Sequence, residues 1–195
     1  MLVVKSNVSK LVVHKTGFTL NELLIVILIF SIILLIAAPS LRNILLEFRL
    51  SGHVNTFVAA HNLARSEAIK RGRLVTVCRS VNAETGSNVC NKNTSGDWDS
   101  NDWGVGWIVY VEDSTATGVG VVGPGEEIIL RQGSLPDKTY IPASVRSVTY
   151  NGLGAPLGSM AGSNFKFNYD GKFDRIVCIA RTGRIRVIRD MLACI

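Results

Sequence analysis

The sequence predicts an α+β protein in which one long N-terminal helix packs on a C-terminal antiparallel β-sheet head. The first observation is an apolar stretch near the N-terminus that continues into residues with apolar side chains at helical spacing. The second is a series of short alternating apolar runs, separated by Gly- and Asn-containing turn signals, in the rest of the chain. With 195 residues, the chain has room for one compact domain and a long additional element.

The apolar stretch has the length of a membrane-spanning helix. It covers residues 18–38, about 30 Å of helix at roughly 1.5 Å per residue, which matches the apolar core of a bilayer. Lys5, Lys10 and Lys15 precede it without an acidic residue. Because positive flanks stay in the cytoplasm, we expect the chain after the stretch to be exported. The net charge of +6 falls to +3 (6 − 3) without these lysines, so only a local cluster of charge could bind a polyanion.

All four cysteines, Cys78, Cys90, Cys178 and Cys194, follow the apolar stretch. An even number of cysteines in an exported domain indicates two disulfides in an oxidising compartment. Three connectivities are possible, and we prefer Cys78–Cys90 with Cys178–Cys194, because short local loops each stabilise by ~3 kcal/mol in the chain-entropy model. A zinc site is the weaker alternative, because the sequence has no Cys-x-x-Cys pair or histidine cluster. We expect no metal and no cofactor.

The residues before the apolar stretch are not those of an ordinary secretory signal, which has its cleavage site after the apolar region. Here Gly17 and Phe18 precede the stretch, and Glu22 lies within its first turns. This segment resembles the signal of type IV prepilins, and Pro39 matches the pilin pattern, whereas Asn21 stands where an apolar residue is usual. The resemblance implies that a prepilin peptidase cuts between Gly17 and Phe18 and methylates the new amine of Phe18.

Glu22 places a carboxylate inside an apolar helix, where it is costly without a partner. The resemblance implies that the partner is the N-terminal amine of a neighbouring pilin subunit, so that Glu22 sets the register of assembly. The alternative is a side chain that extends to the cytoplasmic interface. Pilins are single-pass inner-membrane proteins with a periplasmic head before they join an extracellular pilus or pseudopilus, and we expect the same here, with other pilin subunits as partners.

After Pro39 the helical pattern continues to Arg71, and Gly72 is a stop signal. We predict one helix from Phe18 to Arg71, bent near Pro39. The expected organisation is a leader peptide (1–17), a transmembrane or filament-core helix (18–38), an amphipathic continuation (39–72) and a β-rich head (73–195). Predicted strands of the head are Leu74–Arg79, Gly106–Glu112, Glu127–Arg131, Ser147–Tyr150, Phe165–Tyr169, Arg175–Ala180 and Arg184–Ile188.

Two segments of the head narrow the resemblance. Residues 63–71, which lead into the first predicted strand, are similar to the helix-to-strand passage of the GspH/FimT family of minor pilins and pseudopilins. The Trp-containing residues 102–110 resemble the second strand of that family. We expect Trp103 and Trp107 to pack inside the head and Trp98 to be exposed.

The C-terminal segment 181–189 concentrates positive charge in Arg181, Arg184, Arg186 and Arg189. If residues 184–188 form a strand, Arg184 and Arg186 share one face, while Ile185 and Val187 face the core. Arginines on a stiff hairpin could bind consecutive phosphates of DNA. The alternative is a solvated edge strand that positive charge protects against aggregation.

This segment resembles the Gly-Arg-x-Arg motif of FimT minor pilins, which bind DNA in natural transformation. The resemblance implies that Arg184 and Arg186 are the principal phosphate contacts, with Arg181 and Arg189 in support. Cys194 follows later than the closing cysteine of that motif, which is a departure from it. The alternative function is that of a minor pseudopilin of a type II secretion system, structural and without DNA binding.

No catalytic set is found in the sequence, and we expect no enzyme activity. His14 lies in the leader, and His53 and His61 lie on the predicted helix, where packing or surface roles are more common than chemistry. The acidic residues between Asp97 and Asp102 lack the Gly and Glu of a calcium loop and are interpreted as a turn.

Overall fold

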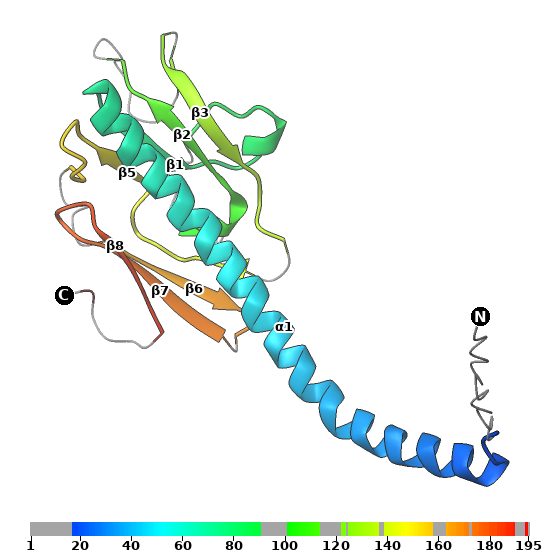
Figure 1. The fold of residues 1–195 in the computed structure, drawn as a ribbon. Coiled ribbons are helices and arrows are strands. Elements are labelled where there is room, and N and C mark those ends of the chain that lie inside the picture. Colours follow the sequence, from blue (N-terminus) through cyan, green and yellow to red (C-terminus); the bar gives the residue numbers. More distant parts are fainter. Residues whose placement is uncertain are drawn as a thin grey trace, which may run out of the picture. The chain divides into compact units, whose positions relative to one another are not determined.

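The computed structural model describes residues 17–90, 101–113, 122–123, 125–136, 139–157, 163–171, 173–189 and 194. The chain divides into two compact units, residues 1–43 and 44–195. Helix α1 (Leu20–Arg71) begins in the first unit and continues into the second (Figure 1). It ends where predicted, at Arg71, and Gly72 follows with a φ of +62° that glycine adopts without strain. It begins at Leu20 rather than Phe18, because Thr19 caps it: the Glu22 amide donates to Thr19 Oγ1 (3.3 Å).

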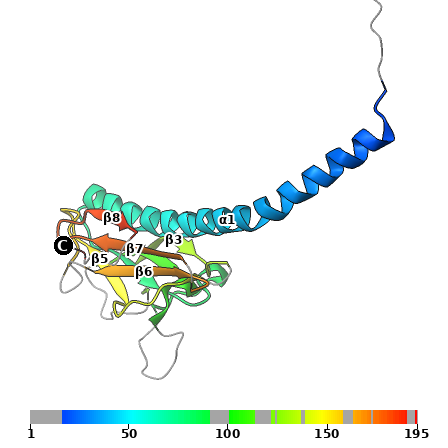
Figure 2. The same ribbon diagram turned by 90° about the horizontal axis from the view of Figure 1, so that it is seen from below.

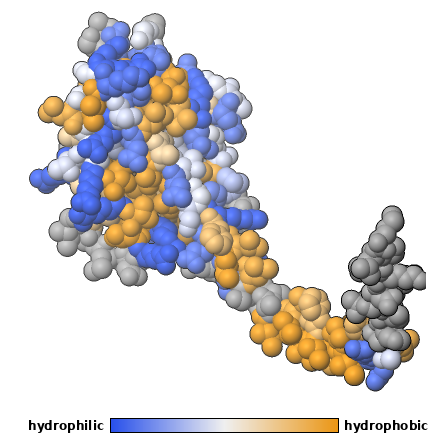
Figure 3. Space-filling view, viewed as in Figure 1, coloured by the Kyte–Doolittle hydropathy of each residue, from blue (hydrophilic) through white to orange (hydrophobic). Residues whose placement is uncertain are grey.

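The first unit exposes its apolar side chains. Every large apolar residue between Leu23 and Ile36 is more than half exposed, and Figure 3 shows apolar side chains over the visible face of this part of α1. Such a helix needs lipid or partner chains around it. By length and composition, no single helix of the described residues qualifies as a membrane span, whereas Leu20–Ile36 and Leu41–Arg71 taken together do. The bend at Pro39 and the boundaries at residues 17 and 38 stay predictions.

The described residues of the head form two antiparallel four-stranded sheets, where the sequence indicated a sheet without showing its division. One sheet has the order β3-β2-β1-β5 and the other the order β4-β6-β7-β8. Seven strands lie within two residues of their predicted bounds, and β4 was missed because it has only two residues. The strands are β1 (Val75–Arg79), β2 (Trp107–Val111), β3 (Glu127–Gln132), β4 (Thr139–Tyr140), β5 (Ser147–Tyr150), β6 (Asn164–Tyr169), β7 (Phe173–Ile179) and β8 (Ile185–Ile188). The described residues also include the short 3-10 helices η1 (Ala83–Thr85) and η3 (Trp103–Val105).

The core of the head forms where the second part of α1 lies across the sheets (Figure 1). Phe57 of α1 is fully buried at its centre. The centroid of its ring lies 5.6 Å from that of Trp103, 5.3 Å from that of Trp107 and 4.8 Å from that of Phe165. Edge-to-face contacts of this kind add to the apolar burial. The packing role predicted for Trp103 and Trp107 is confirmed, and Trp98 lies outside the described residues.

The two described histidines also pack inside the head. His61 is fully buried against Phe57, and its Nδ1 lies 3.1 Å from the Tyr150 hydroxyl of β5. Burial lowers the pKa of His61 from its ordinary value of 6.5 to about 3, so the imidazole is neutral at physiological pH. His53 Nδ1 lies 2.6 Å from Thr139 Oγ1. These contacts join α1 to both sheets.

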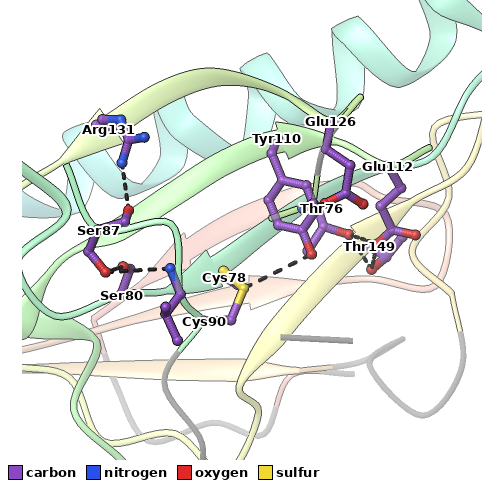
Figure 4. Close-up of a disulfide and its surroundings, with 12 residues drawn as sticks. Thr76, Cys78, Ser80, Ser87, Cys90, Tyr110, Glu112, Glu126, Arg131 and Thr149 are labelled. Carbon is purple, nitrogen blue, oxygen red and sulfur yellow. Dashed lines mark hydrogen bonds between the residues drawn. A yellow bond between two sulfur atoms is a disulfide. The ribbon is translucent and has the colours of Figure 1, made fainter. Parts of the chain in front are cut away.

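Two disulfides join the cysteines in the preferred pairing. Cys78–Cys90 joins the buried strand β1 to the end of the following loop, beside the hydroxyl of Tyr110 (Figure 4). Arg131 of β3 donates to the Ser87 carbonyl and so holds the same loop. Cys178–Cys194 joins β7 to the C-terminal segment that follows β8.

Removal of the second disulfide tests its contribution to the stability of the head. We expect Cys178→Ser with Cys194→Ser to lower the free energy of unfolding by ~3 kcal/mol, because the bond closes a short loop in the unfolded chain. The sequence separation is 16 residues, against 12 for Cys78–Cys90. Urea denaturation of the oxidised chain measures the loss. The Cys78→Ser, Cys90→Ser variant is the comparison, and an unchanged midpoint in the first variant would contradict the expectation.

Candidate functional site

The four arginines of the C-terminal segment lie around one hairpin, on the turn between β7 and β8 and along β8. Arg181 lies in the turn, Arg184 directly before β8, Arg186 within β8 and Arg189 directly after it, and all four are exposed. The Gly183 amide donates to the Ala180 carbonyl (2.8 Å) and the Ala180 amide to the Arg184 carbonyl (2.9 Å). These hydrogen bonds close a tight turn between β7 and β8, which fixes the backbone that carries Arg181 and Arg184.

The register of β8 against β7 shows to which side the arginines point. Val187 lies opposite Val177, and Arg186 lies opposite Cys178. Since directly opposed residues of antiparallel strands share a face, Val187 belongs to the inner face with the buried Val177. Arg184 and Arg186 therefore lie on the outer face, about 6.8 Å apart at roughly 3.4 Å per residue.

One expectation about this strand holds only in part. Val187 lies on the inner face, as predicted, but its side chain is 47% exposed rather than packed in the core. The cause is the place of β8 at the edge of its sheet, where no further described strand covers it (Figure 2). Ile185 lies opposite the buried Ile179 and does pack against the core.

The guanidinium groups of this hairpin differ in their surroundings from Arg71 and Arg175, which pair with carboxylates. Within the described residues, none of the four forms an ion pair, whereas Arg71 pairs with Glu127 (2.5 Å) and Arg175 pairs with Glu47. On the same outer face, Asp174 is already paired with Lys166 (3.1 Å). The hairpin therefore presents positive charge without a described carboxylate to neutralise it, which is suited to binding an anion.

The hairpin rests on a half-buried arginine that sequence reasoning missed. Arg65 of α1 donates from Nε to the Gly154 carbonyl (3.0 Å) and from Nη2 to the Thr182 carbonyl (3.5 Å). Its position in a helical pattern carries no signal of this contact. Nothing local in the sequence joins the loop at 151–157 to the arginine turn.

Asp102, in the acidic segment interpreted as a turn, has a structural role. It accepts hydrogen bonds from the amides of Gly104 (2.8 Å) and Ile141 (2.6 Å), and so caps η3. The described residues contain no group of His, Cys, Asp and Glu side chains that could hold a metal ion. Asp97 and Asp99 lie outside the described residues.

The residues predicted to serve processing and assembly lie at the start of α1. Gly17 and Phe18 precede the helix and are exposed, and Glu22 lies exposed in its first turn. The leader before Gly17 lies outside the described residues. An exposed carboxylate one turn into an apolar helix is available to a cationic group of another chain.

Comparison with known families gives one match for the head and another for the N-terminal segment. Residues 53–183 match the family described as type II transport protein GspH, and residues 14–38 match the prokaryotic N-terminal methylation motif. The chain therefore belongs to the GspH family of minor pilins and pseudopilins. The motif and the helix that follows it indicate a membrane-anchored pilin subunit, which assembles with other pilin subunits.

A solved structure shows the same fold. The chain is similar to the type IV minor pilin FimU of Pseudomonas aeruginosa, with 18% identity and a TM-score of 0.52, over 74% of this chain and 91% of FimU. A second crystal form of FimU gives 19% identity and a TM-score of 0.46, over 69% and 89% of the two chains. A comparison with curated protein sequences gave no match. The predicted pilin fold, a long helix on an antiparallel β-sheet head, is confirmed.

Proposed function

We propose that this chain is a minor type IV pilin whose head binds extracellular DNA for natural transformation through Arg181, Arg184, Arg186 and Arg189. The observation that carries the proposal is the placement of four exposed guanidinium groups, without described ion-pair partners, on one tight hairpin. Arginine donates several hydrogen bonds in a fixed plane and so suits phosphate oxygens. In this proposal the guanidinium groups contact phosphates, which are the same for every base, so binding would be indifferent to sequence.

The N-terminal part serves assembly in this proposal. A prepilin peptidase removes the leader between Gly17 and Phe18 and methylates Phe18, after which Glu22 pairs with the terminal amine of a neighbouring subunit. Before assembly the chain is a single-pass inner-membrane protein with a periplasmic head. The apolar, exposed first part of α1 supports this role, because it requires lipid or other helices around it. No enzyme activity is part of the proposal.

A salt titration of the full chain in neutral detergent tests the proposal. With ~3–4 phosphate contacts, the logarithm of the association constant for a short duplex oligonucleotide should fall with the logarithm of the salt concentration with a slope of about −3. Fluorescence anisotropy of labelled DNA measures the constant. Oligonucleotides of different sequence and equal length should bind with equal affinity, because phosphate contacts carry no sequence information.

The alternative, a minor pseudopilin of a type II secretion system with a structural role, is favoured by the family match to GspH. It predicts no measurable affinity for DNA at any salt concentration. Deletion of the chain would then impair secretion and leave transformation unchanged. Absence of binding in the titration would therefore replace the proposal by this alternative.

A further inference from the structure

Three segments that are distant in the sequence meet under the arginine turn. The side chain of Arg65 on α1 lies between the loop at 151–157 and the turn between β7 and β8, and it donates to a carbonyl of each. The bond to the Gly154 carbonyl measures 3.0 Å and the longer contact to the Thr182 carbonyl 3.5 Å. One guanidinium group thus ties the turn to both the helix and the loop.

The turn and the loop lie so close together that a side chain on Gly183 would collide with the backbone of the loop. A Cβ atom on Gly183 would lie 2.0 Å from the Gly154 carbonyl oxygen and 3.1 Å from Nε of Arg65. A Cβ atom on Gly154 would lie 2.7 Å from Cδ1 of Ile69. Both glycines have positive φ, +77° and +76°, which other residues adopt with strain. The positive φ at both positions, and the 2.0 Å approach to backbone at Gly183, therefore favour glycine in this contact.

The loop is a firm support for the turn. Asn151 Oδ1 accepts hydrogen bonds from the amides of Leu153 and Ala155, both at 3.0 Å, and the Asn151 amide donates to the Ala155 carbonyl (3.0 Å). The Leu157 amide donates to the Thr149 carbonyl (2.9 Å) and so continues the edge of β5. The backbone of the loop is therefore fixed to the sheet of β1, and the turn that leans on it belongs to the other sheet.

We infer that Arg65 is a positioning residue for the DNA-binding arginines. Its guanidinium group holds the turn at Thr182 against the loop. The backbone that carries Arg181 and Arg184, on either side of Thr182, is therefore ordered before DNA binds. A turn that is ordered before binding loses less conformational entropy when phosphates bind. The inference rests on the proposed function, but the effect of the Arg65 hydrogen bonds on the turn can be measured without DNA.

Replacing Arg65 by lysine separates the effect of its hydrogen bonds on the turn from the effect of its positive charge. Lysine keeps the positive charge of Arg65 but carries a single ammonium group, which does not reproduce the planar fork of donors facing two carbonyls. For Arg65→Lys we expect the dissociation constant for duplex DNA to rise ~5–10-fold, the cost of ordering about one further segment on binding. The slope against salt should stay the same, since the arginines that contact phosphate are all present.

Two further measurements report on the tie directly in the full chain in neutral detergent. Hydrogen exchange of the amides of Ala180 and Gly183, which close the turn, should become faster in Arg65→Lys, while exchange in the core strand β7 stays the same. Trypsin should cut after Arg181 sooner, because a protease needs a locally open backbone. The matched control is Arg71→Lys on the same helix, whose partners are Glu67 and Glu127, and it should change neither the exchange of the turn nor DNA binding.

The outcomes distinguish the inference from its alternatives. If Arg65 contacted phosphate itself, Lys would keep the affinity and Arg65→Gln would lower the salt slope by about one, and this result would overturn the positioning role. Faster hydrogen exchange in Arg65→Lys with unchanged affinity for DNA would also overturn the positioning role, since the Arg65 hydrogen bonds would then only stabilise the turn. If the unmodified chain binds no DNA, the proposed function fails, and the exchange experiment still shows whether Arg65 holds the turn.

Discussion

Replacing Arg184 and Arg186 together by Glu should abolish DNA binding by the head. Two charge-assisted hydrogen bonds to phosphate are lost, at about 1.5 kcal/mol or more each, so affinity should fall by roughly 100-fold or more. The two new carboxylates also repel phosphate, and the salt slope should become shallower by about two. Both side chains are exposed on the outer face of an edge strand, so the stability of the head should change by no more than about 0.5 kcal/mol.

The control for this experiment changes the net charge by the same amount elsewhere. Arg42 and Lys70 are exposed on α1, and their replacement by Glu also lowers the net charge by four, two for each substitution. This variant should keep most of its affinity for DNA. Equal loss in both variants would show that binding depends on overall charge rather than on the hairpin. In cells, the Arg184→Glu, Arg186→Glu variant should lose transformation and keep its pili.

Acidification should destabilise the head through His61. The folded protein keeps this imidazole neutral, with a pKa of about 3, whereas the unfolded chain binds a proton near the ordinary value of 6.5. Between these values the unfolded state binds more protons, so the free energy of unfolding decreases as the pH falls. From about pH 7 to about pH 4 the loss from this one residue is on the order of 3 kcal/mol, and it is complete near the folded pKa. A typical domain has only about 5–15 kcal/mol in total.

Urea denaturation at several pH values, followed by tryptophan fluorescence, measures this effect, because Trp103 and Trp107 are buried in the same cluster. In the control variant His61→Gln, the part of the pH dependence that comes from the imidazole should disappear. The hydrogen bonds from Arg71 lower the pKa of the carboxyls of Glu67 and Glu127, and their titration is common to both proteins. A wild-type chain and variant that lose stability in parallel would show that His61 does not titrate as described.

Features set by neighbouring residues could be predicted from the sequence. The end of α1 follows from a helical pattern that stops at Arg71-Gly72, and the strand positions follow from alternation between turn signals. The short spacing of the cysteines indicated the pairing that the structure contains. The alternation of Arg184 and Arg186 likewise indicated a common face, which the register of β8 against β7 supports.

Features that depend on segments meeting in space could not be predicted in this way. Three features depend on how helix and strands pack against one another. They are the division of the head into two sheets, the exposure of Val187 at a sheet edge and the low pKa of His61. The contact of Arg65 with Thr182 joins residues separated by 117 positions. Periodicity and turn chemistry report on a residue and its neighbours, whereas burial and long-range hydrogen bonds are properties of the packed chain. The sequence by itself therefore determined the elements and the arginine motif, and the tertiary structure decided what holds that motif in place.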